Sequence, residues 1–206
     1  REQDTMMKLR YAKTSPFVRK VLVLADELGL ADRIDLAPTD VWSSDTDISR
    51  DNPLGKVPAL VTDEGTFVGS FACCDYLQRR GGGARLIPEE PKDRWRVMQI
   101  HGLGDGLMEA SVAYIIESLR RPKEFIYPGY LDRQFEKMRR SLAALAARRA
   151  DLEHVDLGSI TTACALGYLD LRFADIWDWR AAAPQLADWY ADFAKRPSMQ
   201  KTRPDT

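Results

Sequence analysis

The stretch MKLRYAKTSPFVRKV, residues 7–21, decides the fold of the first part of the chain. Residues 7–12 alternate in a way typical of a strand, and the spacing of apolar residues that follows is typical of a helix. Ser15 and Pro16 stand at the junction, where serine is favoured as a helix N-cap and proline at the first helical position. The stretch therefore predicts a strand followed directly by a helix, and Gly29 predicts the end of that helix.

The pattern downstream completes a small α/β domain. Residues 34–36 predict a second strand, and residues 57–62 and 66–68 predict two strands joined by a hairpin turn. The segment 70–80 predicts a helix. The order β-α-β and then β-β-α is thus expected for a first domain over residues 6–80.

The second part of the chain is expected to be all-helical. Three consecutive glycines and two nearby prolines predict a linker over residues 81–90. Beyond this linker, helical patterns replace strand patterns, and the helical domain is expected to extend from 91 to 206. Four segments carry these patterns, at 95–114, 130–152, 159–173 and 184–195. The third is almost wholly apolar, which predicts a central buried helix.

Composition excludes several classes of protein. The chain has 206 residues, 45% of them hydrophobic and 30% charged, which is ordinary for a globular protein and wrong for a disordered one. The net charge of −1 provides no bulk attraction for nucleic acid or an anionic membrane surface. Apolar runs are too short to span a bilayer, and the polar residues 1–5 do not resemble a secretory leader.

Cysteine and histidine usage indicates a reducing, cytoplasmic and metal-free protein. Cys73, Cys74 and Cys164 are too few to form a disulfide framework, and we expect each to be a small buried hydrophobe. His101 and His154 have no partner at the spacing of metal ligands or of a catalytic triad.

Ser15 is the first candidate functional residue. Its predicted place at a helix N-terminus puts the hydroxyl beside unpaired backbone N–H groups and the positive end of the helix dipole. An anion is stabilised there, and a thiolate is one such anion. The alternative is that Ser15 only caps the helix.

Two further segments could bind a ligand. Pro58 cannot donate to a sheet ladder, so it must lie at an edge or a turn, with a cis peptide bond after Val57. An edge position would leave the Val57 backbone free to pair with an extended peptide. Gly69 and Ser70 open the next helix, where Ser70 is expected as the N-cap of a site suited to a carboxylate. The alternatives are an ordinary turn and an ordinary cap.

Together these segments resemble the glutathione S-transferase family. The resemblance covers nearly the whole chain, through TSPFVRKV (14–21), NPLGKVPAL (52–60), GSFACCDYL (69–77), ACALGYLDLR (163–172) and RPSMQKTRP (196–204). The family has a thioredoxin-like first domain and a helical second domain, which agrees with a division near Gly81.

The resemblance implies roles for individual residues in binding glutathione. Ser15 is at the position of the catalytic serine or cysteine, and serine suggests activation of the glutathione thiolate for conjugation. Val57 should pair its backbone with the cysteinyl part of glutathione, Pro58 should be the cis-proline, and Ser70 should bind the γ-glutamyl carboxylate. Lys56 is either a contact to a glutathione carboxylate or a solvated charge.

Other positions are assigned less directly by the resemblance. Phe17 either flanks the sulfur or belongs to the core. An acceptor pocket for the electrophile is expected between the domains, lined by Tyr11, Met108 and Tyr114.

The sequence departs from the family pattern in two places. Gly69 stands where the family usually has an acid that helps to hold the γ-glutamyl amine. Asp105 of a partner subunit could supply that charge, or it could be an ordinary helix acid. The expected capping box at Ser159 ends in Thr162 instead of the usual aspartate, which bears on helix stability and not on chemistry.

The expected function is conjugation of glutathione to small electrophiles by a cytoplasmic homodimer, with glutathione as co-substrate and no metal. Nucleic acid and membranes are not expected as partners. Two alternatives stay open: a binding or adaptor protein of the same fold with little catalysis, and a glutathione-dependent isomerase or reductase.

Overall fold

The computed structural model describes residues 6–204, which form two compact units. The first unit runs to Ile87 and also includes the segment from Pro197 onwards, and the second is Pro88–Arg196. The expected helical domain over 91–206 is therefore too long at its end, because the last segment packs with the first unit. Residues 1–5, on which the expectation about a leader rested, lie outside the described residues.

A four-stranded mixed sheet forms the centre of the first unit. Its strands are β1 (Met7–Tyr11), β2 (Ile34–Pro38), β3 (Ala59–Thr62) and β4 (Gly65–Val68), in the order β2-β1-β3-β4. β1 pairs with β2 in parallel and with β3 in antiparallel, and β3 and β4 form the antiparallel hairpin. The predicted strands are confirmed, and the unit has the thioredoxin-like arrangement.

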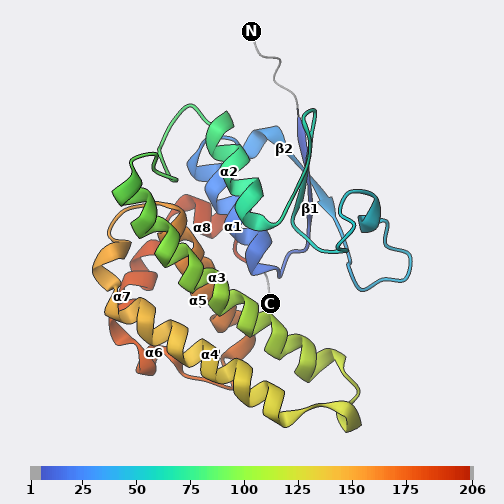
Figure 1. Cartoon of the computed structure of the whole chain (residues 1–206), viewed down its shortest axis with the longest axis vertical. Coiled ribbons are helices and arrows are strands. Elements are labelled where there is room, and N and C mark those ends of the chain that lie inside the picture. Colours follow the sequence, from blue (N-terminus) through green and yellow to red (C-terminus); the bar gives the residue numbers. More distant parts are fainter. Residues whose placement is uncertain (1–5, 205–206) are drawn as a thin grey trace. The chain divides into compact units, whose positions relative to one another are not determined.

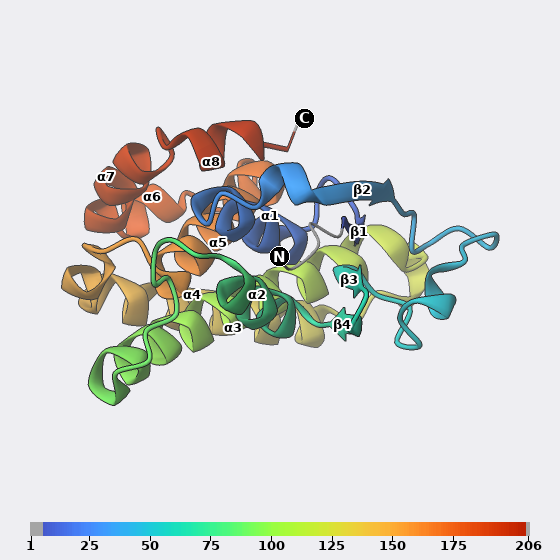
Figure 2. The same cartoon turned by 90° about the horizontal axis from the view of Figure 1, so that it is seen from above.

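Helices α1 (Pro16–Glu27) and α2 (Ser70–Arg80) lie together on one side of this sheet. The loop between β2 and β3 contains the short 3-10 turn η2 (Ile48–Arg50), and it projects on the other side at η2 (Figures 1 and 2). Another 3-10 turn, η1 (Ala31–Arg33), precedes β2. The core between sheet and helices is aliphatic, and Leu9, Leu24, Leu60 and Leu77 have no exposed surface. Burial of such side chains is the main source of the stability of the unit.

Part of the expected linker belongs to the first unit. Leu86 and Ile87 are buried, and both donate their backbone N–H groups to Gln78 Oε1 on α2, over 2.8 and 3.0 Å. The Gln78 amide in turn donates to the carbonyl of Ala84. One buried glutamine thus anchors the chain that leaves α2.

The second unit consists of helices. They are α3 (Pro91–Arg120), α4 (Pro128–Ala147), α5 (Leu157–Phe173), α6 (Trp179–Ala182) and α7 (Pro184–Phe193), with 3-10 turns η3 (Lys123–Phe125) and η4 (Arg149–Leu152). α3 packs against both α4 and α5, and α5 is buried along almost its whole length, as predicted. Gly104 permits the close approach of α3 to α5, since a Cβ there would lie 3.0 Å from Thr161 Cγ2 and 3.2 Å from Thr162 N.

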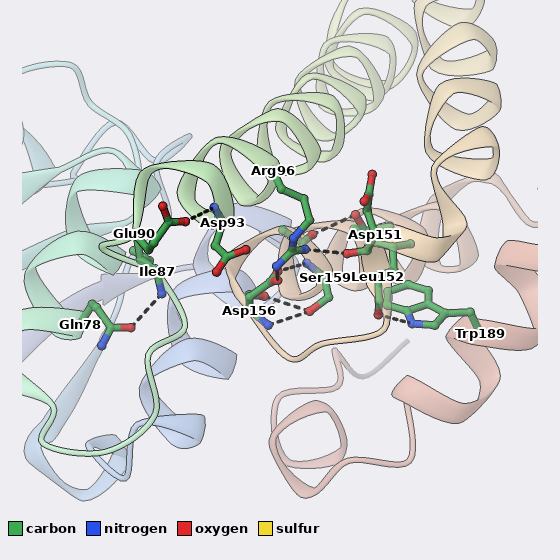
Figure 3. A network of polar contacts seen from close by, with 12 residues as sticks. Gln78, Ile87, Glu90, Asp93, Arg96, Asp151, Leu152, Asp156, Ser159 and Trp189 are labelled. Carbon is green, nitrogen blue, oxygen red and sulfur yellow. Dashed lines mark hydrogen bonds and ion pairs between the residues drawn. The ribbon is translucent and has the colours of Figure 1, made fainter.

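The start of α5 corrects the expected capping box. The N-cap is Asp156, whose Oδ1 accepts from the Ser159 N–H over 3.0 Å, while the Ser159 hydroxyl accepts from the Asp156 N–H over 2.9 Å. Thr162 lies in the second turn and donates its hydroxyl to the carbonyl of Gly158. Figure 3 shows Arg96 reaching from α3 to this cap, with Arg96 Nη2 2.9 Å from Asp156 Oδ2.

Candidate functional site

Three chain segments that are distant in sequence meet at one end of the sheet. The register pairs Arg10 near the end of β1 with Ala59 at the start of β3, and Ala59 with Val68 at the end of β4. The residues that follow β1, precede β3 and follow β4 therefore leave the sheet at the same end. These are the segments that carry Ser15, Val57 with Pro58, and Gly69 with Ser70.

Ser15 is the N-cap of α1, as predicted. Its backbone is extended, and its Oγ accepts from the Val18 N–H over 3.3 Å. Pro16 occupies the first helical position, and the first turn of α1 contains no acidic residue. The positive end of the helix is therefore not neutralised by its own side chains, and the half-buried hydroxyl remains accessible beside it.

The peptide bond between Val57 and Pro58 is cis, as predicted. The alternative of an edge strand is wrong, because β3 lies between β1 and β4, so Pro58 stands in the turn just before an interior strand. Val57 lies outside the ladders and is half-buried, and within residues 6–204 its backbone forms no hydrogen bond to another backbone group. Its backbone can thus pair with an extended ligand.

The N-cap of α2 is Gly69, and not Ser70 as expected. Gly69 has φ +86°, a conformation that glycine adopts at little cost and that an acidic residue adopts only with strain. Ser70 occupies the first helical position and is buried, and its hydroxyl makes no hydrogen bond among the residues that the structure describes. The first turn of α2 also contains no acidic residue.

Phe17 and Lys56 flank these segments. Phe17 is half-buried on the first turn of α1, and the buried Lys20 ammonium lies 6.0 Å from its ring centroid. Lys56 is exposed, and within residues 6–204 its ammonium has no ion-pair partner. Both remain candidates for contacts with a ligand.

The three residues expected to line an acceptor pocket differ in exposure. Tyr11 ends β1 and is half-buried, and Tyr114 on α3 is half-buried against the rings of Phe173 and Phe135, at 5.3 and 6.3 Å. Met108 has no exposed surface, so it is a core residue of α3 and presents nothing to a ligand. Asp105, on the same helix, lies 3.8 Å from His101 Nε2.

The cysteines lie in the core, as expected. Burial raises the pKa of the Cys73 thiol to about 12, and its sulfur donates to the carbonyl of Phe67. Over residues 6–204 there is no cluster of histidine, cysteine or acidic side chains that could hold a metal ion. No helix formed by these residues combines the length and the apolar character needed to cross a bilayer.

The sequence patterns did not indicate two functional candidates, Asn52 and Arg10. Asn52 is buried, and its amide donates to the Lys56 carbonyl over 2.7 Å, so it shapes the turn that leads to Val57. Arg10 is also buried and holds the loop that contains Asn52. The signals were weak: an asparagine before Pro53, and one arginine at a polar strand position.

Comparisons with known proteins agree on one family. A model of the glutathione S-transferase N-terminal domain matches residues 14–80, and a model of the C-terminal domain matches residues 128–192. The chain is 34% identical over 204 residues to the uncharacterized GST-like protein YibF of Escherichia coli K12, across 96% of this chain and 98% of that protein.

Solved structures give the same result. A glutathione transferase family member from Pseudomonas fluorescens Pf-5 with bound glutathione is 41% identical, with a TM-score of 0.92 over 97% of this chain and 100% of that one. A glutathione S-transferase from Methylobacillus flagellatus KT with glutathione bound is 33% identical, with a TM-score of 0.89 over the same shares. The chain therefore belongs to the glutathione S-transferase family.

Proposed function

We propose that the protein is a glutathione transferase that conjugates the glutathione thiolate to small electrophiles. The observation that carries the proposal is the common end of the sheet, where Ser15 offers a hydroxyl that can still donate, and Val57 offers a backbone outside the ladders. The Ser70 hydroxyl, which makes no hydrogen bond among the described residues, opens the helix at the same end. The Pseudomonas fluorescens and Methylobacillus flagellatus structures contain bound glutathione, which supports the same ligand for this chain.

Ser15 is assigned to the thiolate. Its hydroxyl can donate a hydrogen bond to the sulfur while its oxygen keeps the bond from the Val18 N–H. Hydrogen bonding and the helix dipole both stabilise the charged form, so they lower the pKa of the bound thiol. At neutral pH a larger fraction of bound glutathione is then nucleophilic, and its sulfur attacks the electrophile and displaces the leaving group.

The peptide portion of glutathione is assigned to the other two segments. The Val57 N–H and carbonyl pair with the cysteinyl peptide groups in the manner of an added strand. Ser70 and the N-terminus of α2 hold the γ-glutamyl carboxylate, since the hydroxyl and the backbone N–H groups there favour an anion. Lys56 and Phe17 complete the contacts, with the ammonium toward a carboxylate and the ring toward the sulfur.

The remaining parts of the proposal concern the setting of the reaction. We assign the protein to the cytoplasm as a homodimer, with Tyr11 and Tyr114 near the electrophile. Asp105 of the partner subunit is assigned to the γ-glutamyl amine, because Gly69 has no carboxylate for it.

The absence of that carboxylate at Gly69 also favours a second candidate, a binding or adaptor protein of the same fold with little catalysis. Weak or absent glutathione binding would follow from the loss of an acid that pairs with the amine. Calorimetric titration with glutathione, followed by a conjugation assay with an aryl halide, separates the two. Heat of binding together with turnover supports the transferase. The absence of both heat and turnover supports the adaptor.

A glutathione-dependent isomerase or reductase would bind glutathione but give different products. Incubation with a panel of electrophiles and mass analysis of the products separates these activities from conjugation. A product with the added mass of glutathione supports conjugation, an isomer of the substrate supports isomerisation, and glutathione disulfide with a reduced substrate supports reduction.

A further inference from the structure

A buried arginine on β1 links the sheet to the loop that precedes Val57. Arg10 is 8% exposed and projects from the opposite face to Leu9, because successive side chains of a strand alternate. Its Nε donates to Thr39 Oγ1 over 2.9 Å, its Nη1 to Asp51 Oδ2 over 3.0 Å, and its Nη2 to Asp47 Oδ1. One planar guanidinium therefore connects three side chains.

The two carboxylates flank a single turn of the loop between β2 and β3. Asp47 precedes η2 and Asp51 follows it, so the guanidinium forms an ion pair at each end of the turn. Asp51 Oδ2 also lies 3.1 Å from Lys8 Nζ, two residues before Arg10 on the same strand face. Burying a guanidinium costs free energy unless the charge is paired. The pairing with Arg10 therefore holds both carboxylates in place.

Asn52, which follows Asp51, connects this ion-pair network to the backbone that precedes Val57. Asn52 is 1% exposed; its Nδ2 donates to the Lys56 carbonyl over 2.7 Å and its Oδ1 accepts from the Leu54 N–H over 2.9 Å. Its own carbonyl accepts from the Gly55 N–H, and Gly55 has φ +65°. The backbone from Asn52 to Lys56 is thus held by one side chain, and Val57 follows directly.

We infer that Arg10 is a positioning residue for glutathione, acting through Asp51 and Asn52 to fix the Lys56–Val57 backbone against which the peptide pairs. The inference rests on the proposed function and adds to it a residue that does not touch the ligand. Lysine could not replace Arg10, because an ammonium lacks the planar fork of donors that reaches Thr39 and both carboxylates.

The central test compares Arg10→Gln with the matched control Arg79→Gln. Arg79 belongs to the same unit and loses an ion pair of similar kind, with Asp75 over 3.2 Å, but it is exposed on α2. For Arg10→Gln we expect the KM for glutathione to rise about tenfold, equivalent to about 1.4 kcal/mol of lost ordering, with kcat within about twofold. Arg79→Gln should change neither constant, and Arg10→Lys should restore little of the affinity.

Two variants keep the test decisive if Arg10→Gln does not fold. The Asp47 side chain is 52% exposed and that of Asp51 is 17% exposed. Replacing either with asparagine conserves the shape of the side chain and should destabilise the fold less than Arg10→Gln does. Each should raise the KM for glutathione about threefold and speed hydrogen exchange at the Leu54 and Gly55 amides. Because they belong to one chain of contacts, Arg10→Gln combined with Asp51→Asn should be no worse than Arg10→Gln alone.

The possible outcomes separate this inference from the proposed function. Unchanged KM in Arg10→Gln, or in both asparagine variants, would overturn the role of Arg10 while the wild-type protein still binds glutathione. A fall in kcat and thermal stability without a rise in KM would reduce Arg10 to a structural residue. If the wild-type protein gives no heat with glutathione, the proposed function fails, and the role of Arg10 as a glutathione-positioning residue fails with it.

Discussion

Replacing Ser15 with alanine removes one hydroxyl that has two effects of different size. The first effect is on stability, since Ser15 Oγ accepts from the Val18 N–H over 3.3 Å. Loss of a serine N-cap costs about 0.5–2 kcal/mol, and this bond is slightly longer than the usual ~2.7–3.2 Å. We therefore expect a loss of about 0.5–1 kcal/mol, or about 1–4 °C in Tm for a chain of this length.

The second effect is on chemistry and should be larger. A hydrogen bond to a charged group contributes about 1.5–3 kcal/mol, and each 1.36 kcal/mol is a factor of about ten in the protonation equilibrium. Loss of the donor raises the pKa of the bound glutathione thiol. At pH values below the wild-type pKa, the variant should hold about ten- to a hundredfold less thiolate and conjugate more slowly by the same factor. At pH values above the raised pKa, the difference in rate should vanish.

The assay follows the ultraviolet band of the thiolate and kcat across the same pH range, with Ser15→Thr as a control that keeps the hydroxyl. Ser15→Gly separates the two effects, because glycine costs only a few tenths of a kcal/mol at an N-cap but also lacks the donor. A Ser15→Ala protein with the expected small fall in Tm, but with wild-type thiolate absorbance and rate at every pH, would refute the assignment of Ser15 to the thiolate.

Three other side chains lead to measurable expectations. Asp156→Ala removes the cap of α5 and the carboxylate that pairs with Arg96, so the free energy of unfolding should fall by about 3 kcal/mol in urea titrations; a loss no larger than that of a surface ion pair would contradict this. Thiol reagents should modify Cys73 at neutral pH only in unfolded protein, because burial raises its pKa to about 12. Peptide mapping after rapid labelling of the native protein checks this, and a labelled Cys73 peptide would contradict it. The Tyr127 backbone N–H, together with an arginine, holds the pKa of Glu117 below its ordinary value, so its contribution to stability is present above that ordinary value and is lost as the pH falls through the lowered pKa. Glu117→Gln should flatten the acid side of the stability curve, and an unchanged acid slope would exclude this role.

Local signals predicted most of the fold. The Ser15–Pro16 junction, the hairpin and the cis bond at Pro58 each depend on residues within a few positions, and the structure confirms all three. The order of strands depends on pairing between distant segments, so the sequence left Pro58 at an edge or a turn. The pairing of β3 with both β1 and β4 shows that β3 is an interior strand, and therefore that Pro58 lies in a turn.

Helix starts were harder to place where several capping residues stand close together. Asp156 and Ser159 are both good N-caps, and the Asp156 carboxylate that caps α5 is also bound by Arg96, which comes from another helix. The family resemblance presents Gly69 as a missing acid, whereas its positive φ explains the glycine by backbone conformation. Met108 illustrates a further limit, since helical periodicity does not distinguish a residue that faces a pocket from one that faces the core.

The role of Arg10 could not be predicted for a related reason. Alternation along β1 puts Arg10 on the face opposite Leu9, where a charged residue is usually solvated. Its partners Asp47 and Asp51 lie 37 and 41 positions away, in a loop without clear periodicity. Such contacts between a strand and a distant irregular segment leave no local pattern in the sequence.

The return of the final segment to the first unit has a consequence for the order in which the protein is made. α8 (Pro197–Lys201) is tied to α1 by the Arg19 guanidinium, which donates to the Met199 carbonyl over 3.0 Å, and by Lys201 Nζ, 2.8 Å from Asp26 Oδ1. During synthesis the sheet and its helices emerge from the ribosome more than 100 residues before α8 does. The helical unit is thus an insertion between two pieces of the first, and the first unit cannot acquire α8 until the whole helical unit has been synthesised.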